Sequence, residues 1–464
     1  MTGERPGIVR SLNLMKPDRT ENGGVFMGKN VPAGEKIMSG VRMHMPRWEH
    51  SWEESELTRW CRKAAAGGNA DAELLLGLME RYGSGDVNDS REAEELLTKA
   101  AEQGSPVAEA ALGEIFDSRE DYAKAAELYR KAAEHGFHAA ETCLGDLYLE
   151  GHGVSQDYAE ALKWYQSAAD HGEAIAANNL GTLYLDGIGT EQDYGRAMKW
   201  FKKAAGQNEP TAMINLGNMY YEGRGVRKDA GRAFRFYRKA ADLGDAGAQS
   251  TVGDMLVEGD GVAQDFDKAA VWYRKSADQG FPAAQYNLGV MYLEGISVRQ
   301  ELREALRLFT LAAEQGDANA QFNLGTMYLL GHGVRKDPAA ALKLFMKAAE
   351  QNHQSAEVSL GGMYQEGLGV RQDYSESLSW YMKAAEQGNM DGQYNVGRIY
   401  MQGLGVSRDP KEACRWLEKA AAQGDRDAAA CLMALRLDAG EPVDTELLKP
   451  LSGLFRNDGD EEDG

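Results

Sequence analysis

Hydrophobic and polar residues follow one another along this chain in a pattern that repeats about every 36 residues. Its clearest mark is a Leu-Gly or Val-Gly pair, whose glycine stands at Gly77, Gly113, Gly145, Gly181, Gly217, Gly253, Gly289, Gly325, Gly361 and Gly397. Neighbouring glycines are 36 residues apart, except that the second interval is 32. Such a fixed interval is the signature of a repeat protein. We count positions within each unit from this glycine, which is position 0.

Two helices are predicted in each unit. Ala, Leu and Tyr usually stand at positions −5, −1 and +3, and residues four apart share one face of a helix, here called the A helix. The glycine at position 0 costs about 1 kcal/mol of helix stability relative to Ala. Because this cost recurs in each unit, we expect another helix to approach closely there. Glycines at +6 and +8 end the A helix.

The second, or B, helix begins after an Asp at position +12, which is a good N-cap. Ala at +16, an aromatic residue at +19 or +20 and Ala at +23 give it an apolar stripe. Glycine at +27 ends it. Asn208 and Asn352 hold this position in two units, and Asn is the residue that best replaces glycine in a left-handed conformation.

One such helix pair cannot bury both of its apolar faces, but stacked pairs share a continuous core. The sequence therefore predicts an all-α fold, an α/α superhelical solenoid of about ten 36-residue helix-turn-helix repeats. Three places depart from the pattern. Residues 52–67 read as a B helix alone, the unit after Gly113 is four residues short, and Ser297 with Glu301 replaces the usual Gly and Asp of a turn.

The whole pattern resembles the Sel1-like repeat, a relative of the tetratricopeptide repeat, and the segment 284–292 (AQYNLGVMY) is similar to that family's consensus at nearly every place. The resemblance covers about residues 51–440. We expect residues 1–50 to be a flexible basic arm and residues 441–464 to be a short C-terminal extension with an acidic tail.

Charge narrows the classes of partner. The 464 residues carry a formal charge of −21, which argues against binding nucleic acid or an anionic membrane surface. Residues 1–50 carry eight Lys or Arg against five Asp or Glu, so the acidic charge belongs to the repeats. We expect a protein or peptide partner, or the arm itself, to present a basic face. No apolar run fits a signal peptide or a membrane span, so a cytoplasmic location is expected.

Candidate chemistry is sparse. The turn Gly151-His152-Gly153 lacks the third glycine of a dinucleotide fingerprint and follows a helix, so it is interpreted as a helix cap. His135 and His138, with Cys143 downstream, are fewer than the four ligands of a structural zinc site and are expected to be exposed turn histidines. The four cysteines are no disulfide framework. We expect no metal, no cofactor and no catalytic residue.

In Sel1-like solenoids the A helices line the concave surface, so the resemblance implies that a partner binds there. Positions −3 and +1 lie opposite the apolar stripe and vary between units. The candidate binding residues are Asp146, Asn178, Thr182, Ile214, Asn218, Asp254, Tyr286, Phe322, Thr326, Tyr394 and Arg398. The aromatic residues among them either form a binding strip or pack between successive A helices.

The resemblance implies a non-enzymatic protein–protein interaction scaffold or adaptor. One alternative is an immunity or chaperone protein that neutralises a secreted bacterial toxin or effector, which predicts a single tight, basic partner. Another is a hydrolase, which predicts a pocket of converging polar groups that the spacing does not supply.

Overall fold

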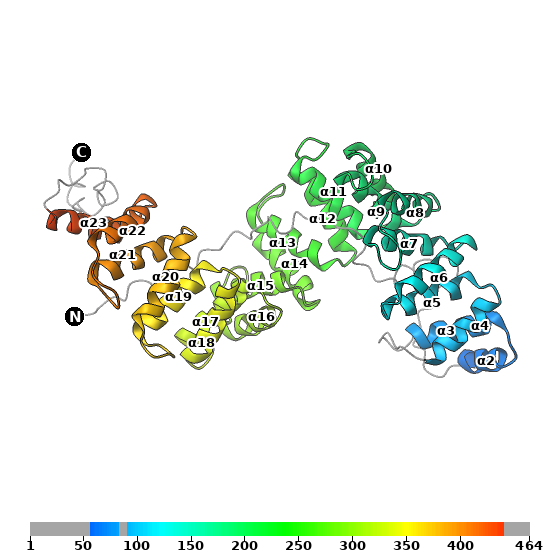
Figure 1. Ribbon diagram of the computed structural model, residues 1–464, viewed down its shortest axis with the longest axis horizontal. Helices are drawn as coiled ribbons and strands as arrows, with labels where there is room; N and C mark the ends of the chain where they lie inside the picture. The colour runs from blue at the N-terminus through cyan, green and yellow to red at the C-terminus, as the bar shows by residue number, and fades with distance from the viewer. Residues whose placement is uncertain (1–55, 83–90, 440–464) are drawn as a thin grey trace. The chain divides into compact units, whose positions relative to one another are not determined.

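The computed structural model describes residues 56–82 and 91–439, and the expected arm and acidic tail lie outside these ranges. The described residues contain 22 α-helices, alternately of the A and B type (Figure 1). The A helices are α3 (Ala70–Tyr82), α5 (Pro106–Ser118), α7 (His138–Glu150), α9 (Ala174–Asp186), α11 (Pro210–Glu222), α13 (Ala246–Glu258), α15 (Pro282–Glu294), α17 (Ala318–Leu330), α19 (Gln354–Glu366), α21 (Met390–Gln402) and α23 (Arg426–Asp438). The B helices are α2 (Glu56–Ala65), α4 (Arg91–Glu102), α6 (Tyr122–Glu134), α8 (Tyr158–Asp170), α10 (Tyr194–Ala205), α12 (Ala230–Asp242), α14 (Phe266–Asp278), α16 (Leu302–Glu314), α18 (Pro338–Glu350), α20 (Tyr374–Glu386) and α22 (Pro410–Ala422).

The described residues divide into two compact units, one up to Gln264 and one from Asp265 onward. Within each unit an A helix packs against the B helix of its own repeat and against the preceding B helix. In the first unit α9 lies in this way between α8 and α10, and in the second α17 lies between α16 and α18. The predicted all-helical solenoid of paired helices is confirmed. Among the described residues, no helix is long and apolar enough to cross a membrane.

The glycine at position 0 lies directly against the ring of the B helix. A Cβ added to Gly181 would stand 2.7 Å from the Phe201 ring, and one added to Gly361 would stand 2.6 Å from the Tyr381 ring. Both rings are buried. The close approach predicted from the repeated cost of this glycine is therefore confirmed, and the partner is the aromatic residue at position +20.

Helix ends follow the predicted capping residues. The Asp193 carboxylate accepts a hydrogen bond from the Arg196 backbone N–H at 2.9 Å, which caps α10. Asn208 and Asn352 adopt the left-handed φ values of 64° and 62° that glycine adopts elsewhere at position +27. Their replacement of glycine is thus explained by backbone conformation.

The four-residue deletion in the short repeat falls entirely within its A–B turn. Helices α5 and α6 keep 13 residues each, and only residues 119–121 join them. Glu120 takes a left-handed φ of 63°, and the Asp121 carboxylate caps α6. The shortened unit therefore differs from the others in its turn and not in its helices.

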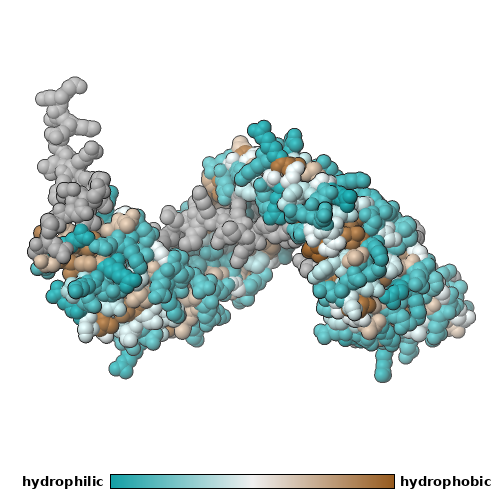
Figure 2. Space-filling model, turned by 45° about the horizontal axis from the view of Figure 1, so that its top comes forward, coloured by the Kyte–Doolittle hydropathy of each residue, from teal (hydrophilic) through white to brown (hydrophobic). Residues whose placement is uncertain are grey.

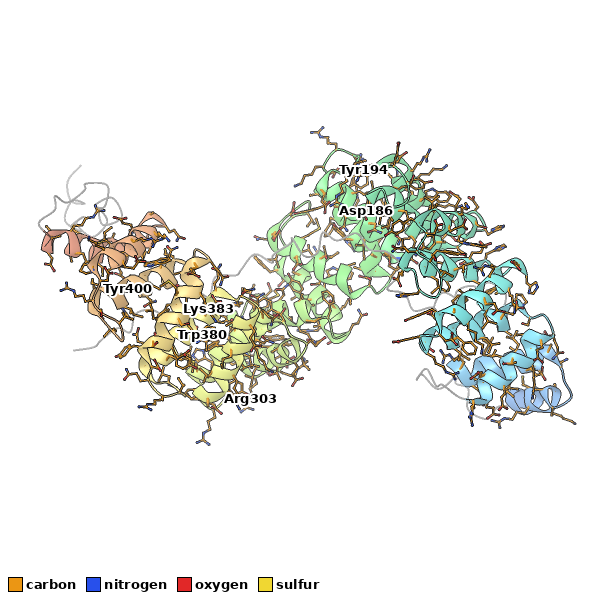
Figure 3. The ribbon with its side chains drawn as sticks, in the orientation of Figure 1. Asp186, Tyr194, Arg303, Trp380, Lys383 and Tyr400 are labelled. Carbon is orange, nitrogen blue, oxygen red and sulfur yellow. The ribbon has the colours of Figure 1, made fainter. Side chains whose placement is uncertain are left out.

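The second glycine of the ordinary A–B turn contacts the preceding repeat. A Cβ added to Gly153 would stand 2.2 Å from the backbone carbonyl carbon of Tyr122, the first residue of α6. Gly225 makes the equivalent approach to Tyr194 at the start of α10, which is labelled in Figure 3. The Gly-x-Gly turn therefore spaces successive repeats as well as ending the A helix.

Ser297 and Glu301 occupy the A–B turn between α15 and α16, and the turn keeps its usual length despite these substitutions. Ser297 adopts a left-handed φ of 54°, and Glu301 makes no side-chain cap hydrogen bond to α16, which still begins at Leu302. We expect Ser297→Gly and Glu301→Asp each to stabilise the protein by about 1 kcal/mol, by relieving the left-handed conformation and by restoring the cap. Thermal unfolding followed by circular dichroism measures both, and an unchanged or lower midpoint would contradict the explanation.

Candidate functional site

The candidate binding residues at positions −3 and +1 are less accessible than their sequence spacing suggests. Asn178, Thr182 and Asp254 are buried, and the other eight are half-buried. The expectation that these positions form the exposed face of the A helices is therefore wrong for the three buried residues. Whether the candidates contact a partner stays a prediction, but many of them also join neighbouring helices.

In the first unit the polar candidates form hydrogen bonds between repeats. The Tyr165 hydroxyl donates to Asp146 Oδ1 at 2.5 Å, and Asn179 Nδ2 of the next A helix donates to the same atom at 3.4 Å. Asn178 Oδ1 accepts from Asn215 Nδ2 at 2.9 Å. Buried polar groups need such partners. These side chains therefore link the successive A helices α7, α9 and α11 by hydrogen bonds.

Three further polar candidates form hydrogen bonds within their own repeats. The Tyr237 hydroxyl donates to Asn218 Oδ1 at 2.6 Å, and the Thr182 hydroxyl donates to the Asn178 carbonyl one turn earlier at 3.2 Å. Thr326 makes the same bond to the Phe322 carbonyl at 3.0 Å. Ile214 is half-buried on the same helix as Asn218.

The aromatic candidates of the second unit pack against B-helix rings. The Tyr286 ring centroid lies 5.9 Å from that of Phe309, and the Phe322 centroid lies 5.6 Å from that of Phe345. Burial, with the charge of Asp317 as a smaller cause, raises the pKa of Tyr286 to about 12. These contacts favour packing over a binding strip for both residues.

Tyr394 and Arg398 lie together on α21. The Arg398 guanidinium stands 5.8 Å from the centre of the Tyr394 ring, and its Nη2 donates to Gln365 Oε1 of α19 at 3.1 Å. Burial raises the pKa of the Tyr394 hydroxyl. A buried Arg398 Nε has no hydrogen-bond partner among the described residues, which leaves this arginine the candidate with unused donor capacity.

A second series of contacts was missed by the sequence reasoning. The residue at position −4 hydrogen-bonds to the residue at +26 of the same repeat: Gln315 Nε2 donates to Gln285 Oε1 at 2.9 Å, and Gln351 Nε2 donates to Gln321 Oε1 at 3.0 Å. The Gln321 amide in turn donates to the Ala313 carbonyl of the preceding B helix. The sequence does carry a signal for this contact, because Gln or Glu recurs at position −4 and Gln or His recurs at position +26.

B helices also carry a repeated cation–π contact. The Lys383 ammonium lies 3.8 Å from the centre of the Trp380 ring on α20 (Figure 3), and Lys419 lies at the same distance from Trp416 on α22. Because Trp416 is buried and the Lys419 ammonium lies over the face of its ring, this pair contributes to the packing of the B helix.

The histidines and cysteines do not assemble as a His135–His138–Cys143 group. His135 Nδ1 lies 2.8 Å from Glu109 Oε2, whereas the His138 ring stacks on that of His171. Cys143 is buried in the apolar core, and no two of the four cysteines form a disulfide.

His353 is a half-buried N-cap whose neutral form the hydrogen bonds require. Its Nδ1 accepts from the Ala356 N–H at 3.2 Å, its Nε2 lies 3.2 Å from Asn319 Oδ1, and its ring stacks on Phe322. Nδ1 is therefore the unprotonated nitrogen and Nε2 the donor. Burial lowers the pKa of His353 below its usual value of 6.5.

Acid should consequently weaken this repeat. Below about pH 6.5 the unfolded chain binds a proton at residue 353 that the folded chain does not, so stability falls as the pH is lowered through this range. We expect His353→Asp, which installs the cap residue that Asp317 provides for α17, to remove this dependence. Urea unfolding at pH 7.5 and 5.5 measures it, with an effect of about 1 kcal/mol for the cap. An equal pH response of the two proteins would refute the assignment.

Comparison with known proteins matches this architecture. The Sel1 repeat model matches residues 70–105, 106–137, 139–173, 174–209, 210–245, 246–281, 282–317, 318–353, 354–389 and 391–425. A protective antigen of uropathogenic Escherichia coli with an SLR fold is 34% identical, with 84% of this chain and 85% of that chain covered and a TM-score of 0.68. A Sel1 repeat protein from Oxalobacter formigenes is 35% identical over 67% of this chain and 90% of that chain, with a TM-score of 0.52.

Curated protein sequences give no match. An immunity protein from Pseudomonas aeruginosa is 22% identical over 45% of this chain and 81% of that chain, with a TM-score of 0.32, a likeness too low to indicate function. The ten consecutive matches agree with the helix pairs and their glycine contacts described above. This chain belongs to the Sel1 repeat family.

Proposed function

We propose that this chain is a non-enzymatic scaffold that binds a protein or peptide partner along its A helices, and that basic groups of the partner meet one acidic edge of each unit. The observation that carries the proposal is the charge of the links that join each B helix to the next A helix. All these links lie at the same end of the antiparallel helix pairs. The surface visible in Figure 2 is mostly hydrophilic, with scattered hydrophobic patches.

Eight B helices end in an exposed carboxylate. The residues are Glu102, Glu134, Asp170, Asp242, Asp278, Glu314, Glu350 and Glu386. A negative charge at a helix C-terminus opposes the helix dipole and costs roughly 0.3–1 kcal/mol. Because helix stability does not favour these residues, a role in recognition explains their recurrence better than a role in folding.

The B–A links and the A–B turns, which lie at opposite ends of the helix pairs, differ in their basic residues. The four-residue B–A links, from 102–105 to 422–425, contain no Lys or Arg in any of the ten repeats. Several A–B turns do contain them, such as Arg227 with Lys228 and Arg335 with Lys336. Each of the ten B–A links therefore carries at least one carboxylate and no basic residue, although most B helices have a Lys in the turn before the link. Complementary charge speeds and orients the approach of a basic partner.

The partially accessible candidates extend this surface onto the A helices. Ile214, Asn218, Thr326 and Arg398 are half-buried, so a partner can reach part of each side chain. These positions vary between repeats while the glycines and caps stay fixed. A fixed frame with a variable surface suits a binding scaffold.

Affinity capture with the full chain as bait, from an extract of the source organism, tests the proposal. We expect one or more proteins with a basic face to be retained in stoichiometric amount and released by raised salt. A single tight partner would favour the neutralising role, and several components of one complex would favour the adaptor role. Retention of no protein above a charge-matched bait would contradict binding altogether.

A further inference from the structure

We propose that His138, Glu141 and His171 form a binding site for a divalent transition-metal ion such as Zn²⁺ in the first unit. His138 is the first residue of α7, and Glu141 lies three residues later on the same helix face. His171 follows the last residue of α8. One ligand atom from each side chain lies within 4.8 Å of the other two.

The Glu141 carboxylate gives the first argument. Glu141 is 5% exposed, and its Oε1 accepts from the Ser167 hydroxyl at 3.0 Å and lies 3.3 Å from His138 Nδ1. Its Oε2 is buried and has no hydrogen-bond partner among the described residues, and His171 Nδ1 stands 3.9 Å from it. A buried carboxylate oxygen without a donor is costly, and a bound cation would satisfy it.

The two imidazole rings give the second argument. They stack with centroids 3.5 Å apart and planes 2° apart, over the same carboxylate. Two histidines and one carboxylate, with a fourth position open to water, are a ligand set that Zn²⁺ accepts at about 2.0–2.2 Å from each atom. Ligand atoms around such an ion are roughly 3.4 Å apart, so coordination needs the rings to rotate slightly out of the parallel stack. Both rings are partly exposed at helix ends, where solvent borders them on one side.

Outer contacts hold the ligands in place. The Ser167 hydroxyl fixes Glu141, and the Ser167 carbonyl lies 2.9 Å from His171 Nδ1. Hydrogen bonds from the groups around a metal site orient its ligands in this way. Ser167 thus contacts two of the three proposed ligands.

This combination occurs in one repeat only. His138, Glu141 and His171 stand at positions −7, −4 and +26, and no other of the ten repeats has His at −7. The preceding repeat shares the other two groups, since Glu109 and His135 lie 2.8 Å apart, but it has Pro106 at −7. It therefore provides a natural control with two of the three ligands.

Isothermal titration of ZnCl₂ into the full chain tests the site. The variants His138→Ala, Glu141→Gln and His171→Gln each install a residue that other repeats carry at the same position, so the fold should be retained. We expect one equivalent of Zn²⁺ to bind to the wild type, and each variant to weaken this binding at least about tenfold. His135→Gln should change the affinity less than about twofold.

Circular dichroism melting of each variant checks that the fold is intact. The proposal would be overturned if the wild type and the double variant His138→Ala/His171→Gln bound Zn²⁺ equally. It would also be overturned if His135→Gln lost as much affinity as His171→Gln, because the ion would then bind exposed histidines in general.

Discussion

Replacing Gly361 by Ala is expected to lower the free energy of unfolding by about 1–2 kcal/mol, although Ala is the better helix former. The new methyl group would stand 2.6 Å from the ring of Tyr381, which is 4% exposed and held between helices. Overpacking of a rigid core costs typically 1–3 kcal/mol, and it outweighs the gain of about 1 kcal/mol in helix propensity. Urea unfolding followed by circular dichroism gives the difference.

Gly362, the next residue of the same helix, is the matched control. A Cβ there would meet only the Tyr381 hydroxyl, at 3.5 Å, which is an ordinary contact distance. Gly362→Ala should therefore stabilise the protein by about 0.5–1 kcal/mol through helix propensity. Equal effects of the two substitutions would show that the contact between glycine and ring does not determine the packing of the repeats.

Gly153→Ala is expected to cause a larger loss, of about 3–4 kcal/mol. Gly153 has a φ of +67°, which costs a residue with a side chain roughly 1–2 kcal/mol. The added Cβ would also overlap the backbone of the preceding repeat, 2.2 Å from the Tyr122 carbonyl carbon and 2.4 Å from the Ala123 nitrogen. Backbone atoms at the start of a helix cannot move aside as a flexible side chain can, so the repeats must separate.

Gly136→Ala isolates the cost of backbone conformation. Gly136 has a φ of +89°, and a Cβ there would have no neighbour within 4 Å. Its replacement should cost only about 1–2 kcal/mol. If the thermal midpoints of the Gly136 and Gly153 variants fell by the same amount, the second turn glycine would not be a contact between repeats.

Much of the fold could be predicted from the sequence because its repeated residues act through local chemistry. An Asp directly before a helix, such as Asp193, caps that helix, and Asn208 adopts the left-handed conformation that glycine adopts at the same position in other repeats. Gly181 indicated a close approach because a helix does not favour glycine. The identity of the ring that meets it, Phe201, depends on how the second helix folds back.

The candidate surface was predicted less well, because the A helix was treated as having one buried face. In α9 ten of the 13 residues are buried, since the helix packs against two B helices and is hydrogen-bonded to both neighbouring A helices. Asn178 was expected to face a partner, but it bonds to Asn215 of the next repeat. The His138–His171 stack was equally hidden, because 33 residues of sequence separate two rings that the fold brings together.

The binding of a captured partner to two charge-neutralised variants tests the proposed function most directly. One variant carries Glu102→Gln, Glu134→Gln, Asp170→Asn and Asp242→Asn on the B–A edge. The matched variant carries Glu150→Gln, Asp186→Asn, Glu222→Gln and Glu258→Gln, an equal charge change at the exposed ends of the A helices. We predict a Kd at least about tenfold weaker for the first variant and nearly unchanged for the second. Equal weakening of both, or an unchanged Kd in the first, would contradict recognition through the acidic edge.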